Sequence, residues 1–140
     1  MSGEYYELLK KRALNALKLA KTAFSYRDYD STAREAEYAA QLYVKAVIYR
    51  VTGEEVRGHN IRSLLGYLAS VLFENDFEEL AHEITDFTRR KRRILAELEE
   101  AHTRAAYSPF EYNKKEAEAL INATKELIEA LRKIERKLFG

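Results

Sequence analysis

Residues 33–68 read AREAEYAAQLYVKAVIYR, then VTGEEVRGHN, then IRSLLGYL, and this stretch decides the fold. In the first part, Ala36, Ala40 and Val47 recur along one face at the spacing of an α-helix. So many alanines predict the close approach of a neighbouring helix. Gly53 is suited to end this helix, because glycine accepts the left-handed conformation without a Cβ clash. The last part repeats leucine at helical spacing and predicts a second, shorter helix.

The same spacing of apolar residues continues on both sides of this stretch. Helices are expected over residues 4–25, 32–52, 61–74 and 77–101, and a last one runs from an Asn113 cap to Leu138. No run alternates polar and apolar residues as a strand does, and no segment repeats. The sequence therefore predicts an all-α fold and a single domain over residues 1–140. The expected architecture is an up-and-down antiparallel bundle of four long helices plus one short helix.

Helix ends and one interruption can also be predicted. Asp30, Ser31 or Thr32 can cap the second helix, and Thr32 with Glu35 fits a capping box there. Asn75 or Asp76 can cap the fourth helix. Lys91 falls on the apolar stripe of that fourth helix. We therefore expect the Lys91 side chain to snorkel to solvent, or the helix to bend or leave the core there.

Composition narrows the possible functions. Lys and Arg number 24 and Asp and Glu 23, so the net charge of +1 does not mark a nucleic-acid binder. Cysteine is absent, which excludes disulfides and thiolate metal sites. The apolar runs are too short to span a bilayer, and the charged N-terminus lacks the apolar region of a signal peptide. These features favour a cytoplasmic protein, and the high charged fraction with no cysteine and one methionine also fits a thermophile.

The spacing Glu-x-x-His, which di-iron helical bundles use, occurs twice, at Glu79/His82 and Glu99/His102. Both copies fall on one predicted helix, twenty residues apart, which is about 30 Å by helical rise. They cannot share a metal ion unless that helix breaks. We interpret these histidines as solvated residues on a helix face, and expect neither a metal site nor a cofactor.

Two clusters of basic residues have alternative interpretations. The run over residues 89–93 can contact phosphates, but a solvated face with local ion pairs explains it more simply. His59 stands at a helix start with Arg57, Asn60 and Arg62 around it. This group can hold a phosphate at the helix N-terminus, and an ordinary role at the helix start explains it equally well.

The stretch over residues 33–68 also resembles the HEPN domain, the higher eukaryote and prokaryote nucleotide-binding domain. That family has an alanine-rich helix with a Lys-Ala pair, a glycine turn, a histidine and a leucine-rich short helix. The matching residues are Ala36, Ala39, Gln41, Lys45, Ala46, Gly53, His59, Leu64 and Leu65. The segment TRAAYSP at residues 103–109 is similar to the Arg-Tyr-Pro-like segment of the family, with two alanines and a serine inserted. The resemblance covers nearly the whole chain.

The resemblance implies a bundle of about five helices and a homodimer. It also implies a prokaryotic protein that partners a small nucleotidyltransferase in a toxin–antitoxin arrangement, with a nucleotide or RNA as ligand. Some members are ribonucleases that carry an Arg followed four to six residues later by a His. None of His59, His82 and His102 has an Arg at that spacing, so no catalytic residue is assigned.

The non-catalytic, nucleotide-binding branch of the family therefore fits better. The candidate nucleotide-binding residues are His59, Arg104, Tyr107, Lys45 and Arg57. Lysine beside the alanine stripe can also simply snorkel or pair with an acid. Two alternatives stay open: a divergent ribonuclease toxin, in which folding brings a histidine to Arg104, and a purely structural interaction bundle.

Overall fold

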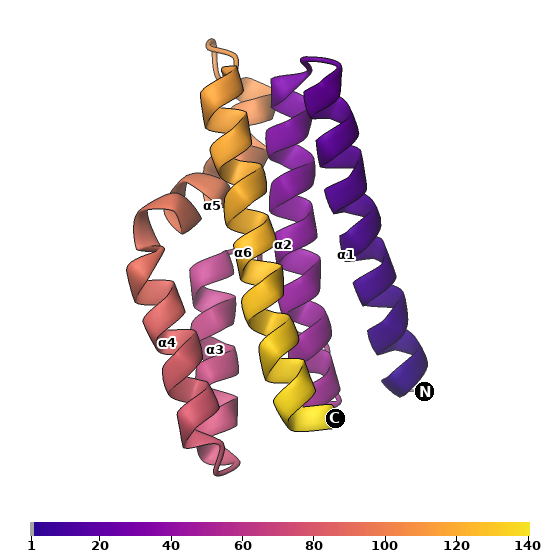
Figure 1. The fold of residues 1–140 in the computed structure, drawn as a ribbon, viewed down its shortest axis with the longest axis vertical. Coiled ribbons are helices and arrows are strands. Elements are labelled where there is room, and N and C mark those ends of the chain that lie inside the picture. Colours follow the sequence, from indigo (N-terminus) through magenta and orange to yellow (C-terminus); the bar gives the residue numbers. More distant parts are fainter. Residues whose placement is uncertain (1) are drawn as a thin grey trace.

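The computed structural model describes residues 2–140, and within that range the chain forms six α-helices and no strand (Figure 1). The helices are α1 (Ser2–Ser25), α2 (Tyr29–Thr52), α3 (Ile61–Glu74), α4 (Glu78–Arg90), α5 (Arg92–Tyr107) and α6 (Lys114–Phe139). The all-α helical bundle predicted from the sequence is confirmed.

Helix α2 is the central element, and α1, α3, α5 and α6 all pack against it. In Figure 1 it lies between α1 and α6, with α3 and α4 forming a separate hairpin. Its alanines are why neighbours come so close: Ala36 and Ala40 are fully buried. The Thr124 hydroxyl of α6 donates to the Ala36 carbonyl at 3.0 Å, so the backbone of α2 is reached directly by a neighbouring side chain. The close approach predicted from the alanines is confirmed.

Residues 53–60, here called the return segment, run back along α2 after it ends. The His59 Nδ1 atom lies 3.2 Å from the Gln41 Oε1 atom, well back from the end of α2 at Thr52. As a result α3 starts beside the middle of α2 and runs in the same direction (Figure 1). The step from α2 to α3 therefore departs from antiparallel alternation, and the candidate site lies at this step.

Two predicted caps are confirmed. Gly53 ends α2 in the left-handed region, with φ of 77°, and its N–H donates to the Tyr49 carbonyl. Asn113 opens α6 with a complete capping box, in which Asn113 accepts from the Glu116 N–H and the Glu116 side chain accepts from the Asn113 N–H. Both helix ends lie where the sequence placed them.

The other predicted caps are wrong. Helix α2 begins one turn earlier than expected, because the Asp28 side chain accepts a hydrogen bond from the Ser31 N–H and takes the capping role from Thr32. Thr32 is inside the helix, where its hydroxyl donates to the Asp28 carbonyl at 2.8 Å. Asn75 closes α3 instead of opening α4, since its side-chain amide donates to the Val71 carbonyl.

The stretch expected as one helix over residues 77–101 is two helices, and they meet at Lys91. Lys91 still donates to the Phe87 carbonyl, but within the described chain the N–H groups of the next three residues reach no carbonyl of α4. The break takes Lys91 off the apolar stripe, and its ammonium pairs with Glu126 on α6. The bend thus keeps the cationic Lys91 side chain from being buried in the core.

The core contains a polar cluster around the Glu135 carboxylate, and it joins three helices. Glu135 of α6 is only 7 % exposed and accepts hydrogen bonds from the hydroxyls of Tyr6 in α1 and Tyr43 in α2. The Lys10 ammonium lies 3.0 Å from the same carboxylate. Burial raises the pKa of Glu135 to about 7.

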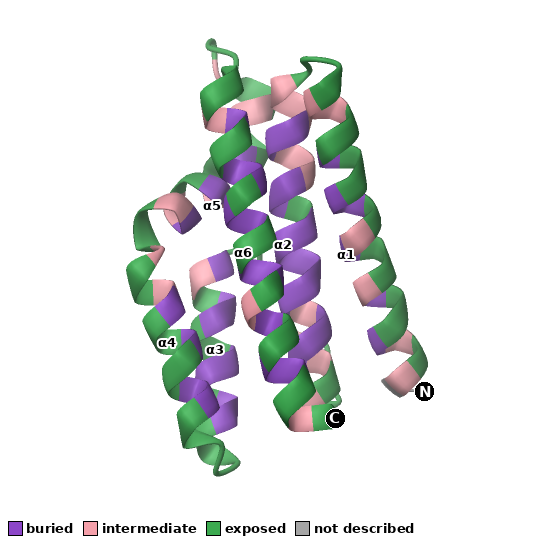
Figure 2. Ribbon diagram, viewed as in Figure 1, coloured by how far each residue is buried: buried purple, intermediate pink, exposed green. Residues whose placement is uncertain are grey.

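Figure 2 shows the buried residues on the faces that the helices turn toward one another.

No helix within residues 2–140 combines the length and the apolar character needed to cross a membrane.

Candidate ligand-binding site

A cavity of about 590 Å³ lies between α1, α2 and the return segment. Its size falls in the range of small-molecule sites, which is roughly 300–1,000 Å³. The lining residues are Tyr5, Leu9, Leu42, Lys45, Tyr49, Glu55, Val56, Arg57, Gly58 and His59. The floor is therefore helical and the outer wall is the return segment.

Three of the five candidate residues meet at this cavity: Lys45, Arg57 and His59. Lys45 follows Gln41 by one helical turn, so it lies on the side of α2 that the return segment covers. Arg57 and His59 come from that segment itself. Glu55 is the single carboxylate among the lining residues, so the cationic groups outnumber the acidic ones. Such a group of donors can hold the phosphates of a nucleotide.

Two tyrosines provide a flat apolar part of the same cavity. The rings of Tyr5 and Tyr49 pack edge to face, with their centroids 4.8 Å apart. Both rings line the cavity, on α1 and α2 respectively. An aromatic surface beside cationic groups is the combination that a nucleotide uses, because the base stacks while the phosphates are paired.

A chain of hydrogen bonds orients His59. The Gln41 amide nitrogen donates to the Glu37 carboxylate at 2.8 Å, which turns the Gln41 carbonyl oxygen toward the His59 Nδ1 atom. His59 must therefore carry a proton on Nδ1 to donate to that oxygen. In the neutral ring the Nε2 atom is then the unprotonated nitrogen.

Glu37 is a functional candidate that the sequence analysis missed. It is 3 % exposed, and burial raises its pKa, against the opposing effects of the Gln41 hydrogen bond and the charges of His102, His59 and Lys45. The signal available in the sequence was its position, one turn before Gln41 on the alanine-rich helix. That signal does not distinguish it from the other acids on the same helix.

Arg104 and Tyr107 lie outside this cavity, near the connection between α5 and α6. The Arg104 guanidinium pairs with Glu116 at 3.0 Å and sits 3.9 Å from the centre of the Tyr112 ring. Tyr107 is 83 % exposed. The structure thus separates these two candidates from Lys45, Arg57 and His59.

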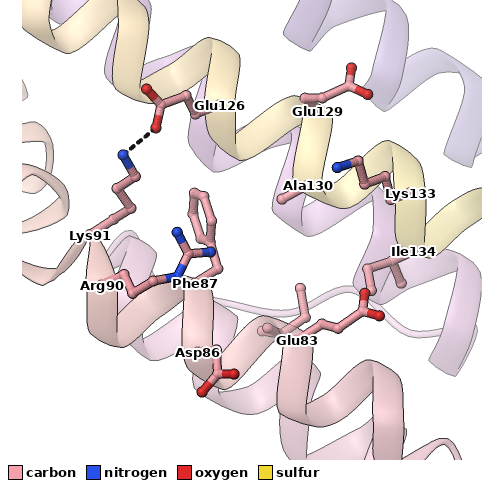
Figure 3. Close-up of a pocket in the computed structure, with 11 residues that line it drawn as sticks. Glu83, Asp86, Phe87, Arg90, Lys91, Glu126, Glu129, Ala130, Lys133 and Ile134 are labelled. Carbon is pink, nitrogen blue, oxygen red and sulfur yellow. Dashed lines mark ion pairs between the residues drawn. The ribbon is translucent and has the colours of Figure 1, made fainter.

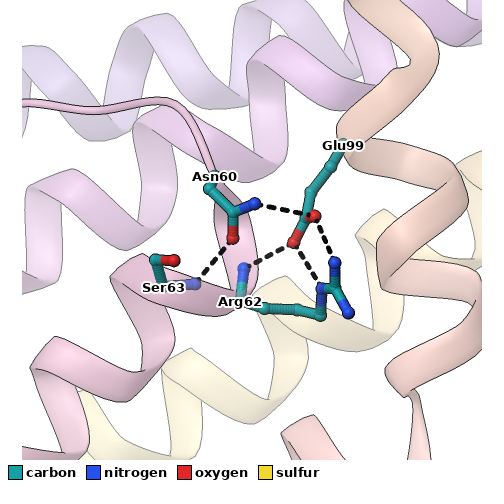
Figure 4. Close-up of polar contacts among 4 residues, drawn as sticks. All are labelled: Asn60, Arg62, Ser63 and Glu99. Atoms are coloured by element: carbon teal, nitrogen blue, oxygen red, sulfur yellow. Dashed lines mark hydrogen bonds and ion pairs between the residues drawn. The ribbon is translucent and has the colours of Figure 1, made fainter.

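The start of α3 is occupied by a carboxylate of the same chain (Figure 4). Glu99 of α5 accepts from the Arg62 backbone N–H at 2.8 Å, from the Arg62 guanidinium at 2.9 and 3.0 Å, and from the Asn60 amide at 3.0 Å. Asn60 also caps the helix by accepting from the Ser63 N–H. Glu99 thus occupies the position at this helix start where a phosphate could be held, which favours the alternative, an ordinary role of Asn60 and Arg62 at the start of the helix.

The same bonds account for Glu99 of the second Glu-x-x-His pair. Its carboxylate is committed to Arg62 and Asn60, and His102 is exposed one turn later. Across residues 2–140, no group of three or more histidine and acidic side chains is placed to hold a metal ion.

A second hollow, of about 400 Å³, lies between α4 and α6 beside the basic run of residues 89–93 (Figure 3). Its charged lining comprises Glu83, Asp86, Glu126 and Glu129 with Arg90, Lys91 and Lys133. Acids outnumber bases, and the Lys91–Glu126 pair drawn in Figure 3 already satisfies one cation. This hollow is a poor place for a phosphate, so the cavity at the return segment is the stronger candidate.

The fold is therefore an all-α bundle in which a return segment lies beside the central helix. Comparison with protein families matches residues 6–134 to the HEPN domain. The match covers nearly the whole chain, so the chain belongs to the HEPN domain family, as its resemblance implied. A search of curated proteins finds no significant match, and neither does a search of solved structures.

Proposed function

We propose that this HEPN-domain chain is a non-catalytic module that binds a nucleotide in the cavity at the return segment. The observation that carries the proposal is the convergence of Lys45, Arg57 and His59 on one cavity beside the Tyr5 and Tyr49 rings. Lys45 and Arg57 pair with phosphate oxygens, the His59 ring donates or accepts a further hydrogen bond, and the base lies against a tyrosine. The pairing of Arg104 with Glu116 supports the non-catalytic part, because that guanidinium is already engaged.

Calorimetric titration with ATP tests the proposal. The wild-type chain is expected to bind, and Arg57→Gln to weaken binding by about tenfold, as the loss of one charge-assisted hydrogen bond implies. Arg104→Gln is the matched control, since it removes the same side chain outside the cavity, and its affinity should equal that of wild type. Absence of heat at millimolar ATP, or equal losses in the two variants, would contradict the proposal.

We propose that the chain forms a homodimer through the end of the bundle where α1 turns into α2 and α5 connects to α6. Exposed aromatic side chains support this surface: Tyr26 is 79 %, Tyr107 83 % and Phe110 75 % exposed. The Tyr112 N–H donates to Asp30 at 2.9 Å and holds the α5–α6 connection against the first turn of α2. Light scattering at tens of micromolar should give a dimer, and a monomer for Tyr107→Ser/Phe110→Ser. A wild-type monomer would refute the dimer.

We further propose a small nucleotidyltransferase as protein partner, in a toxin–antitoxin pair. The family assignment supports this proposal. Co-expression with the nucleotidyltransferase encoded by a neighbouring gene should yield a complex in size exclusion, and the chain alone should slow growth unless its partner is present. Two separately eluting proteins would exclude the pairing.

A further inference from the structure

A groove of about 400 Å³ runs between α1 and α6 and shares no residue with the nucleotide cavity. Its floor is apolar, formed by Leu14 and Leu17 of α1 and Ile128 of α6. Both helices contribute residues at the helical spacing i, i+3, i+4, i+7, from residue 14 to 21 and from 125 to 132. Seven residues of helix rise about 10 Å, so the groove follows the helix axes for about two turns.

The rim of this groove is strongly basic. Lys18, Lys21, Lys125 and Arg132 line it, and all four side chains are exposed. In the described part of the chain none of these four forms an ion pair with a carboxylate. Glu129 is the single acid of the lining, and it pairs with Arg136 at 3.6 Å. Four cations without a described carboxylate partner around one groove contrast with a net charge of only +1 for the whole chain.

We propose that this groove is a docking site for an acidic amphipathic helix of a protein partner. A helix laid along the groove places its apolar side chains on Leu14, Leu17 and Ile128 and its carboxylates opposite the four basic residues. The straight course over two turns and the apolar floor both suit a helix. No aromatic side chain lines the groove, so it lacks the stacking surface that single-stranded nucleic acids use.

A second copy of this chain does not supply such a helix. Its most acidic helix is α4, with Glu78, Glu79, Glu83 and Asp86. The apolar side chains of α4 are already buried in the chain's own core, among them Ile84 and Phe87. The occupant is therefore a different protein.

Fluorescence anisotropy with a synthetic peptide tests the proposal. The probe is a fluorescein-labelled helical peptide of about 18 residues, built from Leu, Ala and Glu with Leu along one face. The wild-type chain should bind it, and Lys18→Glu/Lys125→Glu should weaken binding by at least about tenfold, because attraction becomes repulsion at two positions. The variant Arg12→Glu/Lys115→Glu is the control, since it reverses two exposed cations of the same helices outside the groove.

Two further probes separate a helix site from a merely basic surface. A peptide of the same composition with its leucines permuted off the common face should bind at least about tenfold more weakly, because it cannot cover the apolar floor. A labelled oligouridine should not bind the groove. The proposal is overturned if both double variants weaken the peptide equally, if the permuted peptide binds as tightly, or if oligouridine binds in a manner that Lys18→Glu/Lys125→Glu abolishes. Since the groove shares no residue with the cavity proposed to bind ATP, failure here leaves the nucleotide titration unaffected.

Discussion

Glu99 joins α5 to the first turn of α3 through a single carboxylate. It accepts from the Arg62 N–H, the Arg62 guanidinium and the Asn60 amide, and its side chain is 9 % exposed. Glu99→Ala should lower the free energy of unfolding by about 2 kcal/mol, because these donors lose a charged acceptor and Arg62 reaches solvent only in part. Urea denaturation measures this loss. Glu100→Ala removes an exposed neighbouring acid and should change stability by less than about 0.5 kcal/mol; equal losses would contradict the role of Glu99.

The proximity of candidate site residues could be predicted from the sequence when they share a segment of the chain. It could not be predicted when tertiary packing alone brings them together. Arg57 and His59 stand together in the return segment, and Lys45 is one turn from the glutamine that His59 contacts. Their proximity follows from local geometry. Arg104 is different, because its position depends on how α5 meets α6. The Glu116 carboxylate that binds it is twelve residues away along the chain.

Replacing two different glycines with alanine should change the stability of the chain in opposite directions. Gly53 ends α2 with φ of 77°, so Gly53→Ala should cost about 1 kcal/mol of stability. Gly66 lies within α3 on an exposed face, and a Cβ there meets no atom within 4 Å. Gly66→Ala should therefore stabilise the chain by about 0.5–1 kcal/mol. Thermal unfolding compares the two variants, and a shift of the same sign in both would contradict this account of the helix end.

The junction between α4 and α5 should be visible in amide hydrogen exchange. The N–H groups of Arg92, Arg93 and Ile94 reach no carbonyl of α4 in the described chain. They should exchange at least about tenfold faster than the amides of the helical turns on either side. Exchange measured by NMR provides the comparison, and uniform protection from residue 88 to 98 would show one continuous helix.

The sequence anticipated elements and their order but not all of their ends. Periodicity of apolar residues is a local property, so it located the helical segments, although α4 and α5 were expected as one helix. The cap of α2 was misassigned because Asp28 and Thr32 are both good capping residues, and the fold selected the earlier one. The Lys91 break was among the expected outcomes, and its extent became clear only from the missing backbone bonds.

At the scale of the whole molecule, Glu135 makes the stability of the fold depend on pH, because its carboxyl group joins three helices. Burial raises its pKa from 4.5 to about 7, so the folded chain holds this proton more tightly than the unfolded chain. The resulting stabilisation is complete below about pH 4.5 and is lost as the pH rises through about 7. A rise of the pKa from 4.5 to about 7 corresponds to at most about 3–4 kcal/mol, and the Lys10 ammonium at 3.0 Å reduces the loss by stabilising the carboxylate.

Denaturation at about pH 5 and about pH 8 tests this linkage. Wild type should lose more stability between the two conditions than Glu135→Gln, which has no carboxyl to titrate. Glu118→Gln, an exposed acid on the same helix, should behave as wild type. Identical pH dependence in wild type and Glu135→Gln would contradict the assignment.

The sequence could not indicate this cluster. Glu135 stands in the segment IERKLF, where it resembles any surface acid of an amphipathic helix. Its partners Tyr6 and Tyr43 are 129 and 92 residues away along the chain. Only the tertiary packing of α1, α2 and α6 brings the three side chains together.

The length of the return segment limits how far back along α2 the chain can reach. From Gln41 to Thr52 the helix rises about 17 Å, and the six steps from Gly53 to His59 span at most about 20–22 Å when fully extended. The segment therefore has almost no slack, and the number of its residues, more than their identity, sets where His59 stops along α2. Deleting two residues should withdraw His59 from Gln41 and abolish the contact between them, which the NMR signals of the imidazole ring report. The position of the cavity's outer wall along α2 is thus determined by the number of residues in the return segment.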